Sequence, residues 1–165
     1  TLFEVMSRDQ VDPDEMMFHM NNDLFITKTS GMFVTCVLGK YNLLLDEISW
    51  VNAGHQPAII RNNQGEYRNF DSEAPPMGVI YQKEKSIYKI NKQVLNGNKF
   101  YVFTDGLSES LDEEGNEIGI DGSIKIIEDN YTKDSKKHLS DITKKIIKIS
   151  GPGKLSDDLT LISIG

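Results

Sequence analysis

Short β-prone runs separated by turn-forming residues occupy most of this chain between Met32 and Phe103. Runs rich in Val, Ile and Phe, bounded by Gly, Asn and Asp, predict strands joined by tight turns. The expected strands span residues 33–38, 44–51, 58–61, 86–90, 99–103 and 159–164. We expect turns near Lys40–Asn42, at Asn62–Gly65 and at Asn96–Asn98. Because short turns join successive strands, the pattern predicts mainly antiparallel sheets.

Helical patterns flank these strands. In Asp12-Pro13-Asp14-Glu15, Asp12 is the expected N-cap, Pro13 suits the first turn and Glu15 completes a capping box. The apolar face expected to follow consists of Met17, Met20, Leu24 and Phe25. Residues 1–7 resemble the tail of an earlier helix, and residues 121–130 and 135–150 predict two more. We therefore expect one α+β domain over residues 1–165.

Composition narrows the function classes. The chain has 18 Lys and Arg residues against 25 Asp and Glu residues, a net charge of −7, which disfavours nucleic acid as a partner. Its lysine clusters, Lys133–Lys137 and Lys144–Lys148, are typical of a solvated helix surface. No apolar run is long enough for a membrane span, and no signal-peptide pattern is present. The single Cys36 predicts a buried structural thiol and favours a reducing cytoplasm.

Two aspartate turns lie beside apolar runs. Asp105 follows the run 99–103 in Phe103-Thr104-Asp105-Gly106-Leu107, and Asp157-Asp158 precedes the run 159–164. Asp and Gly are ordinary turn formers, so the first turn alone says little. Adjacent carboxylates repel each other, and a cation or backbone donors would compensate that repulsion. The two turns together suggest a Mg²⁺ or Mn²⁺ site, since such hard cations take oxygen ligands.

Five ordered motifs resemble one family. In chain order they are Asn52-Ala53-Gly54-His55-Gln56-Pro57, Pro76-Met77-Gly78-Val79, Leu95-Asn96-Gly97-Asn98, Phe103-Thr104-Asp105-Gly106-Leu107-Ser108-Glu109 and Ser156-Asp157-Asp158-Leu159-Thr160. This series closely resembles the bacterial SpoIIE-like branch of the PPM (type 2C) metal-dependent serine/threonine phosphatases. The resemblance covers residues from about Pro13 to Gly165.

The resemblance implies a sandwich of two antiparallel β-sheets flanked by helices, with a two-metal site. It assigns Asp105 and Asp157 as ligands of one metal ion, and Asp158 and Gly106 as residues that support these ligands without binding the metal. The implied reaction is direct attack of a metal-activated water on the phosphoryl group, without a phosphoenzyme. Cys36 lacks the cationic surroundings that would make it a rival nucleophile.

His55 and Glu109 are weaker candidates. His55 has the chemistry of a general acid near neutral pH, but a turn-stabilising role is the favoured interpretation. Glu109 suits orientation of a metal-bound water, and a helix first-turn acid explains it equally well. His19 and His138 fall on expected helices and predict surface or groove positions.

Part of the family pattern is absent. In the family, an Asp-x-x-Gly-His-Gly-like sequence carries the metal-bridging Asp, and no such sequence occurs in the 165 residues. In the Leu95–Asn98 motif, Asn98 stands where the family commonly has an Asp. We expect the chain to be the C-terminal part of a catalytic domain, with the N-terminal strands and first helix missing or truncated. Alone, it is expected to be inactive.

The expected substrate, again by resemblance, is a phosphorylated anti-sigma-factor antagonist in a partner-switching pathway. A sensor or receiver domain is expected upstream in the parent chain, and a homodimer is left open. Two alternatives remain: a non-catalytic pseudophosphatase or interaction module, and a small Ca²⁺-binding domain. The second is disfavoured because no loop has regular Asp/Asn ligand spacing.

Overall fold

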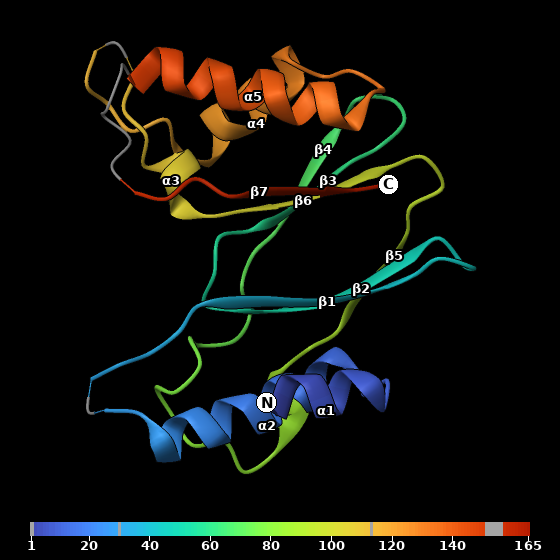
Figure 1. The fold of residues 1–165 in the computed structure, drawn as a ribbon, viewed down its shortest axis with the longest axis vertical. Helices are drawn as coiled ribbons and strands as arrows, with labels where there is room; N and C mark the ends of the chain where they lie inside the picture. The colour runs from blue at the N-terminus through green and yellow to red at the C-terminus, as the bar shows by residue number, and fades with distance from the viewer. Residues whose placement is uncertain (1, 30, 113, 151–156) are drawn as a thin grey trace. The chain divides into compact units, whose positions relative to one another are not determined.

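The computed structural model describes residues 2–29, 31–112, 114–150 and 157–165. The chain divides into two compact units, one formed by residues 1–58 and 70–96 and the other by residues 59–69 and 97–165. Each unit has an antiparallel sheet and helices (Figure 1), which confirms the predicted α+β class. None of the described helices is both long and apolar enough to cross a membrane.

The first unit is a three-stranded sheet covered by helices. Its elements are α1 (Leu2–Arg8), α2 (Pro13–Thr27), β1 (Cys36–Asn42), β2 (Glu47–Ala53), the 3-10 helix η1 (Lys85–Ile87) and β5 (Asn91–Val94). The strand order is β1-β2-β5, and α1 and α2 lie on one side of the sheet (Figure 1). Its buried core includes Met17, Val51, Ala53, Met77 and Tyr88.

The second unit carries the aspartate turns. Its elements are β3 (Ala58–Arg61), β4 (Tyr67–Phe70), β6 (Lys99–Phe103), α3 (Asp105–Ser108), α4 (Gly119–Asp129), α5 (Ser135–Ser150) and β7 (Leu161–Ile164). The strand order is β4-β3-β6-β7, with α4 and α5 on one face of the sheet (Figure 1). Its core includes Tyr101, Phe103, Leu107, Ile142 and Ile146.

Several predicted elements are confirmed. Strands β3 and β6 and helix α5 have the predicted bounds, and α4 differs by two residues at its start and one at its end. The Asn62–Gly65 turn joins β3 to β4, a strand that the sequence reading missed. The side chain of Asn62 explains this turn, because its Oδ1 accepts the N–H groups of Gln64 and Glu66, both at 2.9 Å.

The predicted strand 33–38 is confirmed only at residues 36–38, and the predicted turn near Lys40–Asn42 is wrong. Strand β1 continues to Asn42, and the turn lies at residues 43–46. Asn42 Oδ1 accepts the N–H groups of Leu44 (3.0 Å) and Leu45 (3.2 Å), and Asp46 takes a positive φ of 50°. This side-chain-bonded turn delays β2 to Glu47, three residues later than predicted.

The predicted strand 86–90 is also wrong. Residues 85–87 form the 3-10 helix η1, and strand β5 begins at Asn91. The apolar side chains of Ile87, Tyr88 and Ile90 pack against the first unit's core instead of alternating along a ladder. The more polar segment that follows pairs with β2, so pairing with a neighbour outweighed local β propensity.

Smaller details also differ. Asp12 is the residue before α2, but its side chain makes no capping hydrogen bond and lies 3.6 Å from Lys40 Nζ. Of the predicted apolar face of α2, Met17 is fully buried and Met20 and Leu24 are partly buried. Phe25 is 37% exposed, beyond the core, where it contacts Tyr81. Strand β7 begins at Leu161, two residues after the predicted start.

Candidate metal centre

The pairing of β6 with β7 brings the two aspartate turns together. The strands are antiparallel, with Phe103 at the end of β6 opposite Leu161 at the start of β7. Asp105 therefore follows one strand at the same edge of the sheet where Asp157 precedes the other. This one pair of strands brings together two aspartates that are 52 positions apart in the sequence.

Thr104 links the two turns directly. Its Oγ1 donates a hydrogen bond to the main-chain carbonyl of Asp158 at 2.7 Å and accepts the N–H of Thr160 at 2.9 Å. Its own backbone N–H donates to the Thr160 carbonyl at 3.0 Å. Sequence reasoning gave Thr104 no role, and the sequence held no signal for this link, because its partners on the second turn are main-chain atoms of Asp158 and Thr160.

Asp105 stands at the first position of α3, and its side chain is partly buried. The Asp105 carbonyl accepts the Glu109 N–H at 2.8 Å and the Ser108 hydroxyl at 3.3 Å. These bonds hold the backbone of Asp105 in one turn of helix. The carboxylate thus projects from a fixed backbone and not from an open loop.

Gly106 allows the close approach of the two turns. A Cβ at this position would lie 2.6 Å from the Asp158 carbonyl oxygen and 3.1 Å from that of Asp157. Both neighbours are backbone atoms, which cannot swing aside as a flexible side chain can. A side chain at this position is therefore incompatible with the observed contact between the turns.

Asp157 and Asp158 are both exposed. The carboxylate of Asp157 accepts the backbone N–H of Asp158 at 2.7 Å through Oδ1, so a backbone donor offsets part of the repulsion between these neighbours. Asp158 is held through its main chain by Thr104. The main-chain carbonyl of Asp158, and not its carboxylate, therefore links the two turns.

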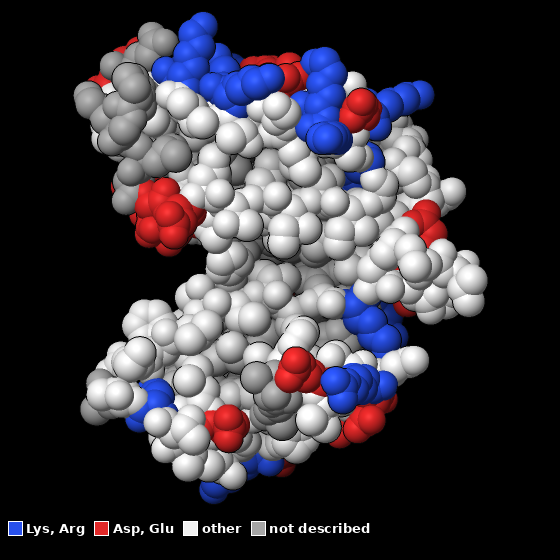
Figure 2. All heavy atoms as spheres, viewed as in Figure 1, with Lys and Arg blue, Asp and Glu red and all other residues white. Residues whose placement is uncertain are grey.

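The ligand types fit a hard divalent cation. Asp105 and Asp157 offer carboxylate oxygens on adjoining turns, as Mg²⁺ and Mn²⁺ prefer. Within the described ranges, no group of three or more His, Cys, Asp or Glu side chains gathers as a metal site. The residues present therefore fit part of a ligand set, and Figure 2 shows acidic side chains gathered over the region of α3.

His55 belongs to the first unit and follows β2. Its Nδ1 lies 3.1 Å from Thr35 Oγ1, and its backbone N–H donates to Asn52 Oδ1 at 2.9 Å. The Asn52 amide in turn donates to the Gln56 carbonyl at 2.9 Å. The Asn52 side chain thus holds this turn, while the imidazole lies against Thr35, so both the turn-stabilising and the general-acid role of the His55 ring stay predictions.

Two expectations about the other candidates are wrong. Glu109 is the C-cap of α3 and not an acid in the first turn, so a favourable interaction with the N-terminal end of the helix dipole does not explain it. Its proposed role in orienting a metal-bound water stays a prediction. His138 is 1% exposed and is neither a surface nor a groove residue, whereas His19 is exposed as expected. Buried His138 contacts Tyr101 Oη at 3.0 Å through Nε2 and the Asn130 carbonyl at 2.9 Å through Nδ1.

Cys36 is half-buried at the start of β1, less deeply than predicted. Burial raises the pKa of its thiol, which keeps it protonated near neutral pH. A protonated thiol is a poor nucleophile, in agreement with the interpretation that Cys36 carries no chemistry.

Comparison with known proteins gives the same fold. The curated phosphoserine phosphatase RsbU of Bacillus subtilis is 22% identical over 152 residues, covering 92% of this chain and 44% of that protein. The SiaA-PP2C domain of Pseudomonas aeruginosa superposes with a TM-score of 0.81 at 14% identity, covering 98% of this chain and 64% of the other. The manganese-presoaked phosphatase domain of SpoIIE from Bacillus subtilis superposes with a TM-score of 0.65 at 17% identity. This match covers 99% of this chain and 69% of that domain.

The likeness to these structures confirms the PP2C-type fold predicted from the motifs. The chain spans less than half the length of RsbU. A family model described as stage II sporulation protein E matches residues 1–165, the whole sequence. This chain therefore belongs to the SpoIIE family.

Proposed function

We propose that the chain is part of the catalytic domain of a divalent-metal-dependent protein serine/threonine phosphatase. Asp105 and Asp157 are the ligands of one Mn²⁺ or Mg²⁺ ion, and Asp158 and Gly106 support them. The observation that carries the proposal is the link between the turns, in which Thr104 bonds the main chain beside Asp157.

The family match and the named relatives support the reaction class. One relative is named a phosphoserine phosphatase, and one related domain was soaked with manganese. A divalent cation, when bound, supplies an activated water and neutralises phosphate charge. The chain's own contribution is to hold two carboxylates on a rigid frame: α3 positions Asp105, and the Asp158 N–H orients Asp157.

The proposed substrate is a phosphorylated anti-sigma-factor antagonist, and the pathway is partner switching. This rests on the motif resemblance together with the similarity to RsbU. This sequence has no motif for the metal-bridging carboxylate, and we propose that another part of the parent protein supplies it. We expect the isolated chain to be inactive, because its sequence lacks the motif that carries the family's metal-bridging Asp.

The test compares Asp105→Asn, Asp157→Asn and Asp158→Asn in the complete parent protein, using a phosphoserine peptide and Mn²⁺. We expect the first two variants to lose most turnover and to bind Mn²⁺ more weakly by calorimetry. Asp158→Asn should have a smaller effect on both. Wild-type turnover in both Asp105→Asn and Asp157→Asn would show that the metal assignment is wrong.

A pseudophosphatase is the alternative. It predicts that the parent protein binds a phosphorylated partner in the presence of chelator and releases no phosphate in Mn²⁺. Phosphate release by the wild type that stops in chelator excludes this alternative.

A further inference from the structure

Helix α5 has a charge opposite to that of the whole chain. It contains five lysines (Lys136, Lys137, Lys144, Lys145 and Lys148) and one acidic residue, Asp141, a net charge of +4. The complete sequence has a net charge of −7. Figure 2 shows Lys and Arg side chains gathered over the region of α5. We call these five lysines the α5 lysine face.

The fold turns this face toward solvent. His138, Ile142 and Ile146 are buried on the opposite side of the helix, in the core of the second unit. All five lysines are exposed, and the side chains of Lys137 and Lys144 are 65% and 75% accessible. The apolar side of α5 is therefore already occupied, and its charged side is the part available to a partner.

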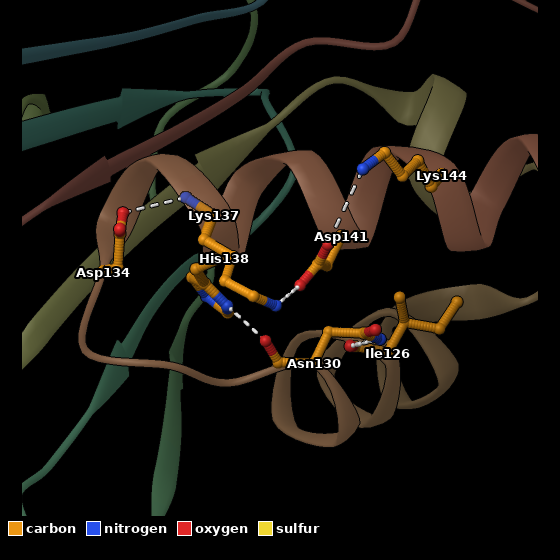
Figure 3. Close-up of polar contacts among 7 residues, drawn as sticks. All are labelled: Ile126, Asn130, Asp134, Lys137, His138, Asp141 and Lys144. Atoms are coloured by element: carbon orange, nitrogen blue, oxygen red, sulfur yellow. Dashed lines mark hydrogen bonds and ion pairs between the residues drawn. The ribbon is translucent and has the colours of Figure 1, made fainter.

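Intramolecular ion pairs leave most of this charge uncompensated. Asp141 pairs with Lys137 and lies 3.9 Å from Lys144, so one carboxylate serves two ammonium groups (Figure 3). The hydrogen bond from Lys137 lowers the pKa of Asp141, which keeps this single negative charge in place. In the described part of the chain, no carboxylate forms an ion pair with Lys136, Lys145 or Lys148.

The C-terminal part of the lysine face lies at the end of the second unit that carries the aspartate turns. The C-terminal end of α5 is at the same end of the second unit as α3 (Figure 1). Asp157 follows the last residue of α5, Ser150, by seven residues, which limits the separation of their Cα atoms to about 25 Å. A protein domain that presents a phosphoserine to the turns is large enough to contact both places.

We propose that the α5 lysine face docks an acidic surface of the phosphoprotein substrate. This inference rests on the proposed function and names the surface that selects its substrate. A lysine face attracts a negatively charged partner at long range, and uncompensated charges of this kind favour association and correct orientation. Ile147, 47% exposed between Lys144 and Lys148, adds an apolar contact typical of protein interfaces.

An acidic protein fits this face better than a lipid surface or nucleic acid. Insertion of a basic helix into a bilayer needs a free apolar side, and that side of α5 is buried. An extended polyanion would also approach the acidic remainder of a chain with net charge −7. A short acidic segment or patch of a protein can contact α5 alone.

The binding test uses the parent protein in chelator and a fluorescent phosphoserine peptide flanked by Asp and Glu. We expect Lys144→Glu/Lys148→Glu to bind about tenfold more weakly by fluorescence anisotropy. Lys83→Glu/Lys92→Glu is the charge-matched control, since both residues are exposed in the first unit, and should bind as the wild type does. Circular dichroism checks that each variant is folded.

Equal affinities of the two double variants for the peptide would overturn the proposal. It would also be overturned if phosphatidylserine vesicles or duplex DNA bound as tightly as the peptide and lost binding in the α5 variant. Raising the ionic strength from about 0.05 M to about 0.3 M should weaken the wild-type complex toward the level of the α5 variant.

A turnover test separates docking from catalysis. In the parent protein, Lys144→Glu/Lys148→Glu should raise KM for the acidic phosphopeptide and leave KM for p-nitrophenyl phosphate unchanged. A rise in both KM values would contradict a docking role. If the wild type hydrolyses neither substrate, the proposed phosphatase function fails, and the binding test still decides the docking surface.

Discussion

Thr104 Oγ1 donates a hydrogen bond to the main-chain carbonyl of Asp158 across 54 residues of sequence, at 2.7 Å. The same oxygen accepts the Thr160 N–H, so one hydroxyl uses both its donor and its acceptor capacity. This arrangement fixes the backbone of both aspartate turns at once. The geometry of the candidate metal centre therefore depends on a residue that is not itself a proposed ligand.

Replacing Thr104 with Val should separate the two turns. The variant keeps the shape of the side chain but loses both hydrogen bonds of the hydroxyl, so we expect a loss of about 1–2 kcal/mol in the free energy of unfolding. Urea denaturation measures this loss. Thr104→Ser, which keeps the hydroxyl, is the control and should fall between the wild type and Thr104→Val. A Thr104→Val protein as stable as the wild type would refute the linking role.

Gly106→Ala should displace the Asp157–Asp158 backbone, because the added Cβ would lie 2.6 Å from the Asp158 carbonyl oxygen. We expect a destabilisation of about 1–3 kcal/mol in chemical denaturation. Gly39→Ala is the matched control, since its Cβ meets neighbours only at 3.5 Å and beyond. If both substitutions have the same small effect, the two turns do not approach as closely as the structure shows.

His138→Leu should destabilise the second unit although the Leu side chain is similar in size to that of His. The substitution leaves the Tyr101 hydroxyl and the Asn130 carbonyl without their imidazole partner in a buried place, at a cost of about 1–3 kcal/mol per unsatisfied group. Thermal unfolding followed by circular dichroism measures the change. His19→Leu, at an exposed position, should change stability by less than about 0.5 kcal/mol. Equal effects of the two substitutions would contradict the burial of His138.

Asp112 should make stability depend on acid pH. Its Oδ1 accepts the N–H groups of Glu114 and Asn116, both at 2.9 Å, and the backbone bond from Asn116 is the main cause that lowers its pKa below the ordinary 3.8. Because the folded pKa is the lower one, the contribution is present above the ordinary pKa and is lost as pH falls through the folded pKa. Asp112→Asn should therefore lower stability at neutral pH and reduce its acid dependence.

Unfolding curves of wild type and Asp112→Asn, recorded from neutral pH to below 3.8, test this sign. The difference between the two proteins should shrink as pH falls. A difference that grows toward low pH would show that the Asp112 carboxylate does not stabilise the loop.

Local signals were sufficient where neighbouring residues decide the structure. Strands β3 and β6 combine β-prone residues with turns next to them, and the turn after β3 is built by Asn62 bonding its own neighbours. Helix α5 shows an apolar side at helical spacing, which the fold buries as Ile142 and Ile146. The signals that set the bounds of these segments, such as the Asn62 turn and the helical spacing of α5, lie within a few residues of one another, so the sequence contains them.

The predictions that were wrong concern segments whose structure depends on residues far away in the sequence. The shift of β1 and the loss of the predicted strand at 86–90 arise where pairing and core packing outweigh local propensity, as with Tyr88, whose burial in the core raises its pKa to about 12. His138 was misplaced because helical position alone does not reveal that Tyr101 and Asn130 surround it.

By itself, the sequence determined the family, the α+β class and the identity of Asp105 and Asp157 as candidate ligands, because ordered motifs and local periodicity are properties of the chain. Only the tertiary structure decided that these aspartates adjoin, that Thr104 links them and that Gly106 must lack a side chain. The pairing of β6 with β7 is a long-range contact between segments about fifty residues apart. No local propensity specifies such a contact; it is selected by the packing of the whole unit.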